Sequence, residues 1–190
     1  MHKGRLEAFS DGVMAIIITI MVLEFKVPHG ASFSDLSELA PVFLSYILSF
    51  IYIGIYWSNH HHLLQITRQV DGLVLWANTH LLFWLSLVPF VTNWMHETHN
   101  QPVPVATYGI VLFMAGAAYR ILTIALLRKH PKDSALHKAI GSDFKGKISV
   151  VAYLLGISVA YFSVYISIFV YIAVAIMWIV PDRRIESIIE

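Results

Sequence analysis

The sequence predicts an all-α integral membrane protein with six transmembrane helices. Three observations lead to this fold class: an apolar composition, apolar segments of membrane-spanning length, and an uneven distribution of lysine and arginine between the loops. Of the 190 residues, 57% are apolar and 13% are charged, whereas soluble proteins average roughly 45–50% and about 25%. The mean hydropathy is +0.68. A soluble chain of this size needs far more charge on its surface, so the composition nearly excludes a water-soluble enzyme.

A helix that crosses the bilayer needs about 20 mostly apolar residues, and we expect one transmembrane domain over residues 1–190. The six predicted spans are residues 8–26, 41–59, 72–92, 105–127, 147–163 and 165–181. A polar, turn-forming stretch at 28–38 separates the first two spans, and residues 93–104 separate the third and fourth. The apolar run from Ile148 to Val180 is too long for one span. We therefore expect a tight hairpin near residues 161–167.

The positions of lysine and arginine predict the orientation of these spans. If both termini are cytoplasmic, the inside regions collect Lys3, Arg5, Arg68, Arg128, Lys129, Lys132, Lys138, Lys145, Lys147, Arg183 and Arg184. The outer loops then hold only Lys26 among the basic residues, together with Glu24, Asp35, Glu38 and Glu97, while Arg120 falls within the fourth span. An excess of basic residues in cytoplasmic loops is the normal pattern for membrane proteins, so we expect both termini inside.

Several function classes are excluded by what the sequence lacks. Without cysteine there are no disulfides, iron–sulfur clusters or thiolate metal sites. A net charge of +1 gives no indication of a nucleic-acid partner. There is also no glycine-rich phosphate loop, nucleophile elbow or paired-carboxylate arrangement. We therefore expect a protein that is not an enzyme.

The first span carries a stripe of residues spaced three and four apart, as on one face of a helix. The stripe consists of Gly12, Ala15, Ile16, Thr19 and Leu23. Small residues on such a stripe allow another helix to approach closely or place the helix near a symmetry axis. Thr19 is open to two interpretations, because its hydroxyl can also bond the carbonyl four residues earlier and be satisfied locally.

Polar residues of three spans lie at a similar depth on the cytoplasmic side. We expect a polar layer formed by Ser10, Asp11, His60 or His61, and Asn78. Polar groups inside a bilayer are costly and mark functional positions. Asp11 can stabilise the start of its helix, anchor that helix to its neighbours, or face a vestibule for cations.

The histidines do not form an evident metal site. Three consecutive histidines, His60 to His62, point in three directions on a helix and cannot chelate one metal together. A haem held by His80 and one of these three is an alternative hypothesis. His96 and His99 flank Glu97 in an outer loop, but surface histidines rarely bind zinc without a built geometry. We expect no metal and no cofactor.

The opening of the first span resembles the signature of the transmembrane protein 175 family, the lysosomal-type potassium channels. The matching features are a Phe9-Ser10-Asp11 core, Arg5 four residues before it, and Ile16, Thr19 and Leu23 after it. Two later stretches look like the prokaryotic, single-repeat branch of that family: Trp57-x-x-His60-His61 and Leu87-Val88-Pro89-Phe90. The resemblance spans most of the chain and is most specific in the first span.

The resemblance implies a homotetramer of six-span subunits in a prokaryotic plasma membrane, with the first helix lining a central pore. By position, Ile16 matches the hydrophobic constriction, Thr19 a hydroxyl layer and Leu23 a further ring, and Ile20 shares this surface. The family motif also implies a buried network that holds the pore helix. Its residues here would be Arg5, Phe9, Ser10 and Asp11, with His60, His61 and Asn78 as partners chosen by depth alone.

The expected function is a passive, potassium-preferring cation channel whose partners are other copies of the chain, membrane lipid and permeant cations. No Thr-Val-Gly-Tyr-Gly filter is present, so ions would pass a narrow side-chain pore instead of stacked carbonyls. The alternative is a proton-coupled or proton-conducting transporter in which Asp11 and the histidines relay protons.

Overall fold

The computed structural model describes residues 3–28, 30–67, 69–128, 130–131, 134, 137 and 143–179. All regular structure in these residues is helical. The helices are α1 (Lys3–Leu23), α2 (Phe33–Ser37), α3 (Ala40–Gln65), α4 (Gly72–Ser86), α5 (Val88–Glu97), α6 (Pro102–Leu127), α8 (Phe144–Val159) and α9 (Val164–Ile179). The all-α prediction is confirmed for this part of the chain.

The first four predicted spans correspond to helices long and apolar enough to cross a membrane: α1, α3, α6 and the α4–α5 pair, Gly72–Glu97. Within the third predicted span the helix is interrupted at Leu87 and restarts as α5. Pro89 lies at the start of α5. Proline lacks an amide hydrogen and clashes with the preceding turn, so it is tolerated at a helix start but interrupts a continuous helix.

The last two predicted spans correspond to α8 and α9, which have 16 residues each. The turn between them covers residues 160–163, slightly before the predicted hairpin. Several residues used above lie outside the described part of the chain: 180–181 of the sixth predicted span, and Arg68, Lys129, Lys132, Lys138, Arg183 and Arg184. Within the described residues, four segments have the length and composition of membrane spans, and α9 is a shorter apolar helix.

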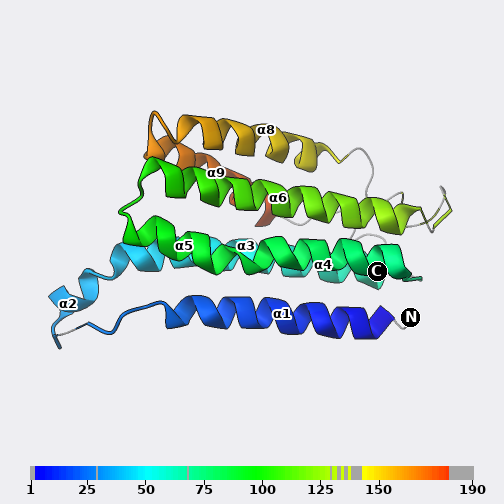
Figure 1. Cartoon of the computed structure of the whole chain (residues 1–190), viewed down its shortest axis with the longest axis horizontal. Helices are drawn as coiled ribbons and strands as arrows, with labels where there is room; N and C mark the ends of the chain where they lie inside the picture. Colours follow the sequence, from blue (N-terminus) through cyan, green and yellow to red (C-terminus); the bar gives the residue numbers. More distant parts are fainter. Residues whose placement is uncertain are drawn as a thin grey trace.

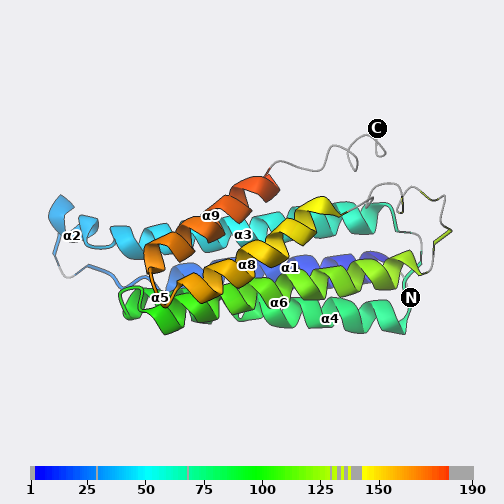
Figure 2. The same ribbon diagram turned by 90° about the horizontal axis from the view of Figure 1, so that it is seen from above.

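The long helices run side by side in one elongated bundle (Figures 1 and 2). The pore-helix candidate α1 lies along one edge of the bundle, and α8 lies along the opposite edge in Figure 1, with α6 between α8 and the α4–α5 pair. The short helix α2 projects beyond the end at which the α8–α9 turn lies. Because α1 packs on α3, α4 and α5 and lies at an edge, one of its faces is not covered by the part of the chain that the structure describes.

The α8–α9 hairpin is held against α6 by a buried tyrosine. Tyr171 is fully buried, and its hydroxyl donates to the Val105 carbonyl at 3.3 Å. A Cβ placed on Gly109 would overlap the Tyr171 hydroxyl, and one on Gly156 would lie 2.5 Å from a carbon of the Tyr171 ring. Both glycines therefore leave room that the ring fills, which sets how closely α6, α8 and α9 approach.

Candidate functional site

The helix α1 has a buried face and an exposed face. The residues on the buried face follow helical spacing and pack into the bundle: Leu6, Ser10, Met14, Ile17 and Met21. The opposite face carries Ile16, which is 58% exposed, and Leu23, which is 78% exposed. Exposed apolar faces of this kind mark contact with lipid or with another protein surface. The stripe predicted from the sequence therefore points away from the other described helices.

Thr19 lies on the exposed face of α1, and its hydroxyl donates to the Ile16 carbonyl at 3.0 Å. This agrees with the local interpretation of Thr19, although the carbonyl is three residues earlier, not four. A hydroxyl that donates one hydrogen bond still has oxygen lone pairs that can accept another. The contact therefore leaves the Thr19 oxygen able to meet water or a cation on the exposed face.

A buried chain of hydrogen bonds ties the opposite face of α1 to α4 and α3. Ser10, Asn78 and His60 have no exposed surface. The Asn78 Nδ2 donates to Ser10 Oγ at 2.9 Å, and Ser10 Oγ donates to the Leu6 carbonyl at 2.8 Å. We call Ser10, Asn78 and His60 the buried triad.

The directions of these bonds define the tautomer of His60. With Asn78 Nδ2 used as a donor, its Oδ1 must accept from His60 Nε2, which lies 2.7 Å away. The Nε2 atom therefore carries the proton. The other ring nitrogen, Nδ1, is buried and has no hydrogen-bond partner in the described part of the chain. An unpaired buried acceptor lowers the stability of the fold. Loss of the Nε2 hydrogen bond to Asn78 as well would therefore destabilise the protein further.

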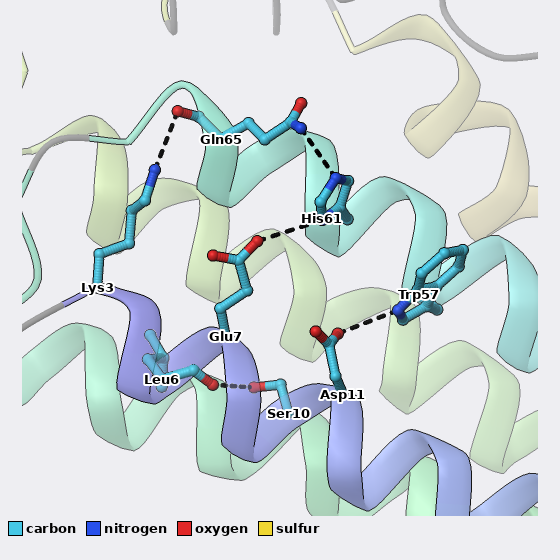
Figure 3. A network of polar contacts seen from close by, with 8 residues as sticks. All are labelled: Lys3, Leu6, Glu7, Ser10, Asp11, Trp57, His61 and Gln65. Atoms are coloured by element: carbon cyan, nitrogen blue, oxygen red, sulfur yellow. Dashed lines mark hydrogen bonds and ion pairs between the residues drawn. The ribbon is translucent and has the colours of Figure 1, made fainter.

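A second set of polar contacts joins α1 to α3 along the edge of the bundle (Figure 3). Lys3 Nζ donates to the Gln65 carbonyl at 3.1 Å, Glu7 Oε1 lies 3.2 Å from His61 Nδ1, and Trp57 Nε1 donates to Asp11 Oδ1 at 3.0 Å. The α1 residues are four apart and their α3 partners are four apart in reverse order, as antiparallel helices require. We call these three contacts the α1–α3 ladder.

Comparison with known proteins identifies the family. The sequence profile described as endosomal/lysosomal potassium channel TMEM175 matches residues 5–89. A protein named potassium channel from a Chryseobacterium species is 56% identical over 187 residues, which cover 98% of this chain and 97% of the relative. The chain belongs to the TMEM175 family. This confirms the resemblance found in the first span.

One TMEM175 homologue of known structure shares the fold, and relatives found by sequence differ in the ion that they are named for. A crystal structure of a lysosomal potassium-selective channel TMEM175 homologue from Chamaesiphon minutus has a TM-score of 0.81 at 29% identity, covering 95% of this chain and 97% of that one. The endosomal/lysosomal proton channel TMEM175 of Gallus gallus is 30% identical over 146 residues, 68% of this chain but 29% of the relative. The family is one of membrane ion channels, not of enzymes, and its named ions are cations.

The residues predicted for the anchoring network, from the family motif and from depth, separate into three groups. The structure brings Ser10, His60 and Asn78 together in the buried triad. It pairs Asp11 with Trp57 and His61 with Glu7 in the α1–α3 ladder, so neither Asp11 nor His61 is part of the triad. Arg5 and Phe9 are exposed, because a helix turns about 100° per residue and carries both away from the face that holds Ser10.

Sequence reasoning did not find the other ladder residues in this TMEM175 chain. Lys3, Glu7 and Gln65 had no assigned role, and Trp57 was noted only within a motif. The signal that could have found them is the matched spacing of four residues on two consecutive helices. Arg120, which falls within the fourth predicted span, pairs with Asp143 at 3.0 Å.

Two of the histidines named in the haem hypothesis, His80 and His60, have hydrogen-bond partners at Nε2. His80 Nε2 accepts from Trp84 Nε1 at 2.9 Å, and His60 Nε2 belongs to the buried triad. The outer Glu97 is paired with Lys26 at 2.7 Å. Across the part of the chain that the structure describes, no group of three or more His, Asp or Glu side chains is arranged to hold a metal ion.

Proposed function

We propose that this protein is a potassium-preferring cation channel whose pore is lined by the exposed face of α1 from several copies of the chain. The observation that carries the proposal is the exposed stripe on α1, which holds Ile16, Thr19, Ile20 and Leu23 on a helix that lies at the edge of its bundle. A relative 56% identical over nearly the whole chain is named a potassium channel, which supports the choice of ion.

The proposed assembly is a homotetramer of six-span subunits in a prokaryotic plasma membrane, with both termini cytoplasmic. In this arrangement α8 and α9 are the fifth and sixth spans. Sixteen residues of helix extend about 24 Å, less than the bilayer core of about 30 Å. Short spans are accommodated by local bilayer thinning and by flanking polar side chains that reach the interface. Lys145, one of these flanking residues, lies over the Trp178 ring at 5.9 Å.

Conduction in this proposal is passive and depends on side chains. A ring of Ile16 side chains forms an apolar neck, which stops ions by excluding water until it widens. An open neck removes part of the hydration shell of the passing ion. Potassium ions give up this water more easily than sodium ions do. Thr19 oxygens replace some of that water without adding charge. The selectivity expected from such a pore is modest, because no carbonyl filter is present.

Asp11 is proposed to hold α1 in place, not to line the pore. Its carboxylate accepts from the Trp57 indole at 3.0 Å, which directs it toward α3 and away from the exposed stripe. The buried triad holds α1 from the adjoining side through Ser10. Two attachments at the same end of α1 fix its rotation about its own helix axis. This rotation determines which α1 side chains face the central axis of the pore.

The alternative is a proton-conducting or proton-coupled transporter. The relatives named proton channels favour it, as does the presence of a buried histidine within a hydrogen-bonded chain. A proton pathway of this kind predicts flux that depends on a pH gradient and is lost when His60 is removed.

The test is ion flux from proteoliposomes under imposed potassium, sodium and proton gradients, with Ile16→Asn as the variant. Potassium flux faster than sodium flux, raised by Ile16→Asn because a polar ring wets more easily, supports the proposal. The matched control is Ile176→Asn on α9, where the isoleucine is 59% exposed and is not on the stripe. Equal effects of both variants would place Ile16 away from the axis, and proton flux without potassium flux would favour the transporter.

A further inference from the structure

The middle contact of the α1–α3 ladder contains its one imidazole. His61 Nδ1 lies 3.2 Å from Glu7 Oε1, and the two side chains are 37% and 23% exposed. Histidine is the side chain that ordinarily changes charge between about pH 5 and about pH 8. Because its side chain is partly exposed, His61 is accessible to water. Figure 3 shows its ring between Glu7 and Gln65.

Gln65 is the third residue at this contact, and its hydrogen bond differs between the neutral and the protonated forms of the His61 ring. Gln65 Nε2 lies 2.9 Å from His61 Nε2. An amide nitrogen only donates, so the uncharged ring accepts at Nε2 and donates from Nδ1 to Glu7. A proton added at Nε2 opposes the Gln65 amide, which must turn to offer its oxygen. The Glu7 contact then becomes an ion pair, and charge-assisted hydrogen bonds are about twice as strong as neutral ones.

The other charged and titratable groups near His61 are arranged along the same two helices. On α1 the neighbouring contacts hold Lys3 and Asp11, bound to the Gln65 carbonyl and to Trp57. On α3 the His62 ring lies 5.9 Å away, and His60 is turned into the buried triad. Of the other helices packed on α3, α5 carries its titratable groups at its far end, and α9 meets α3 through Tyr171 and Tyr52. Glu7 is therefore the carboxylate that meets His61 directly.

We propose that Glu7 and His61 are positioning residues for the pore helix and make conduction respond to pH at the membrane face that carries the N-terminus. This inference rests on the proposed channel function. The helix α1 is continuous from Lys3 to Leu23, so a rotation at the ladder is carried to Ile16, a little over two turns from Glu7. Protonation strengthens the middle contact and favours the arrangement of α1 described above. Deprotonation weakens it and frees α1 to rotate.

The experiment records potassium current in planar bilayers while the pH of each face is changed in turn. Between about pH 8 and about pH 5.5 we expect the current to change roughly threefold or more, since one hydrogen bond per subunit roughly doubles in strength. Only one face should produce this response. His61→Gln and Glu7→Gln should each abolish it, and Glu7→Asp should retain it. His62→Gln, which removes the adjacent imidazole, is the matched control and should leave the pH profile unchanged.

A current that does not depend on pH overturns the proposal, and so does a pH response that survives in both His61→Gln and Glu7→Gln. If these two variants fail to assemble, Gln65→Leu keeps both partners and removes the opposing amide, so the midpoint must move to higher pH. An unmoved midpoint also overturns the proposal. Absence of potassium current at every pH contradicts the proposed channel function and this inference together, whereas a pH-insensitive potassium current contradicts this inference alone.

Discussion

The buried triad makes a strong prediction about stability, because Asn78 is bonded on both sides. Asn78→Leu keeps a side chain of similar size but removes both of its hydrogen bonds, to Ser10 at 2.9 Å and to His60 at 2.7 Å. Ser10 still donates to the Leu6 carbonyl. Within the described residues, His60 loses its one hydrogen-bond partner, and its Nδ1 already has none. One newly unsatisfied buried donor costs roughly 1–3 kcal/mol, and the lost bond to Ser10 adds about 1 kcal/mol.

We therefore expect Asn78→Leu to lower the free energy of unfolding by about 2–4 kcal/mol. The assay is reversible unfolding of purified protein in detergent or lipid nanodiscs, followed by tryptophan fluorescence. Thr79→Ala is the matched control, because Thr79 is the next residue on α4, is exposed, and bonds only the Leu75 carbonyl of its own helix. Ser10→Ala should be non-additive with Asn78→Leu, since both remove the same bond. Additive effects, or a loss no larger than that of Thr79→Ala, would refute the triad as an attachment of α1.

Two further predictions concern packing and pH. Gly109→Ala should lower the melting temperature through an overpacking cost of about 1–3 kcal/mol, since its Cβ overlaps Tyr171; the control Gly54→Ala, whose Cβ meets nothing within 4 Å, should have no such effect. Hydrogen bonds from the Ser32 hydroxyl and amide lower the pKa of the Asp35 carboxyl. This helix cap therefore contributes its full stability above the unfolded-state pKa of Asp35, about 3.9. The contribution is lost as the pH falls through the pKa of Asp35 in the folded protein. The protection factors of the α2 amides, which correct for the intrinsic pH dependence of exchange, should fall on acidification, and Ser32→Ala should remove that fall; unchanged protection factors in acid would contradict the cap.

The membrane fold class and the positions of the first four spans were predictable from the sequence, because transfer into a bilayer depends on local composition and length. The stripe on α1 was also predictable. Its members recur every three or four residues, and the period of a helix places them on one face whatever surrounds it. The interruption at Leu87 has a local cause in Pro89, but the apolar run continues through it and conceals the break.

The partners of the polar residues were decided only by the tertiary structure. Depth in the membrane grouped Ser10 and Asn78 with His60 or His61 and with Asp11. In the structure hydrogen bonds join Ser10, Asn78 and His60, whereas Asp11 and His61 have other partners. Depth follows from position along a helix, whereas pairing follows from the rotation of each helix about its axis. That rotation results from the packing of many side chains, such as Tyr171 between Gly109 and Gly156, and no single segment of sequence contains it.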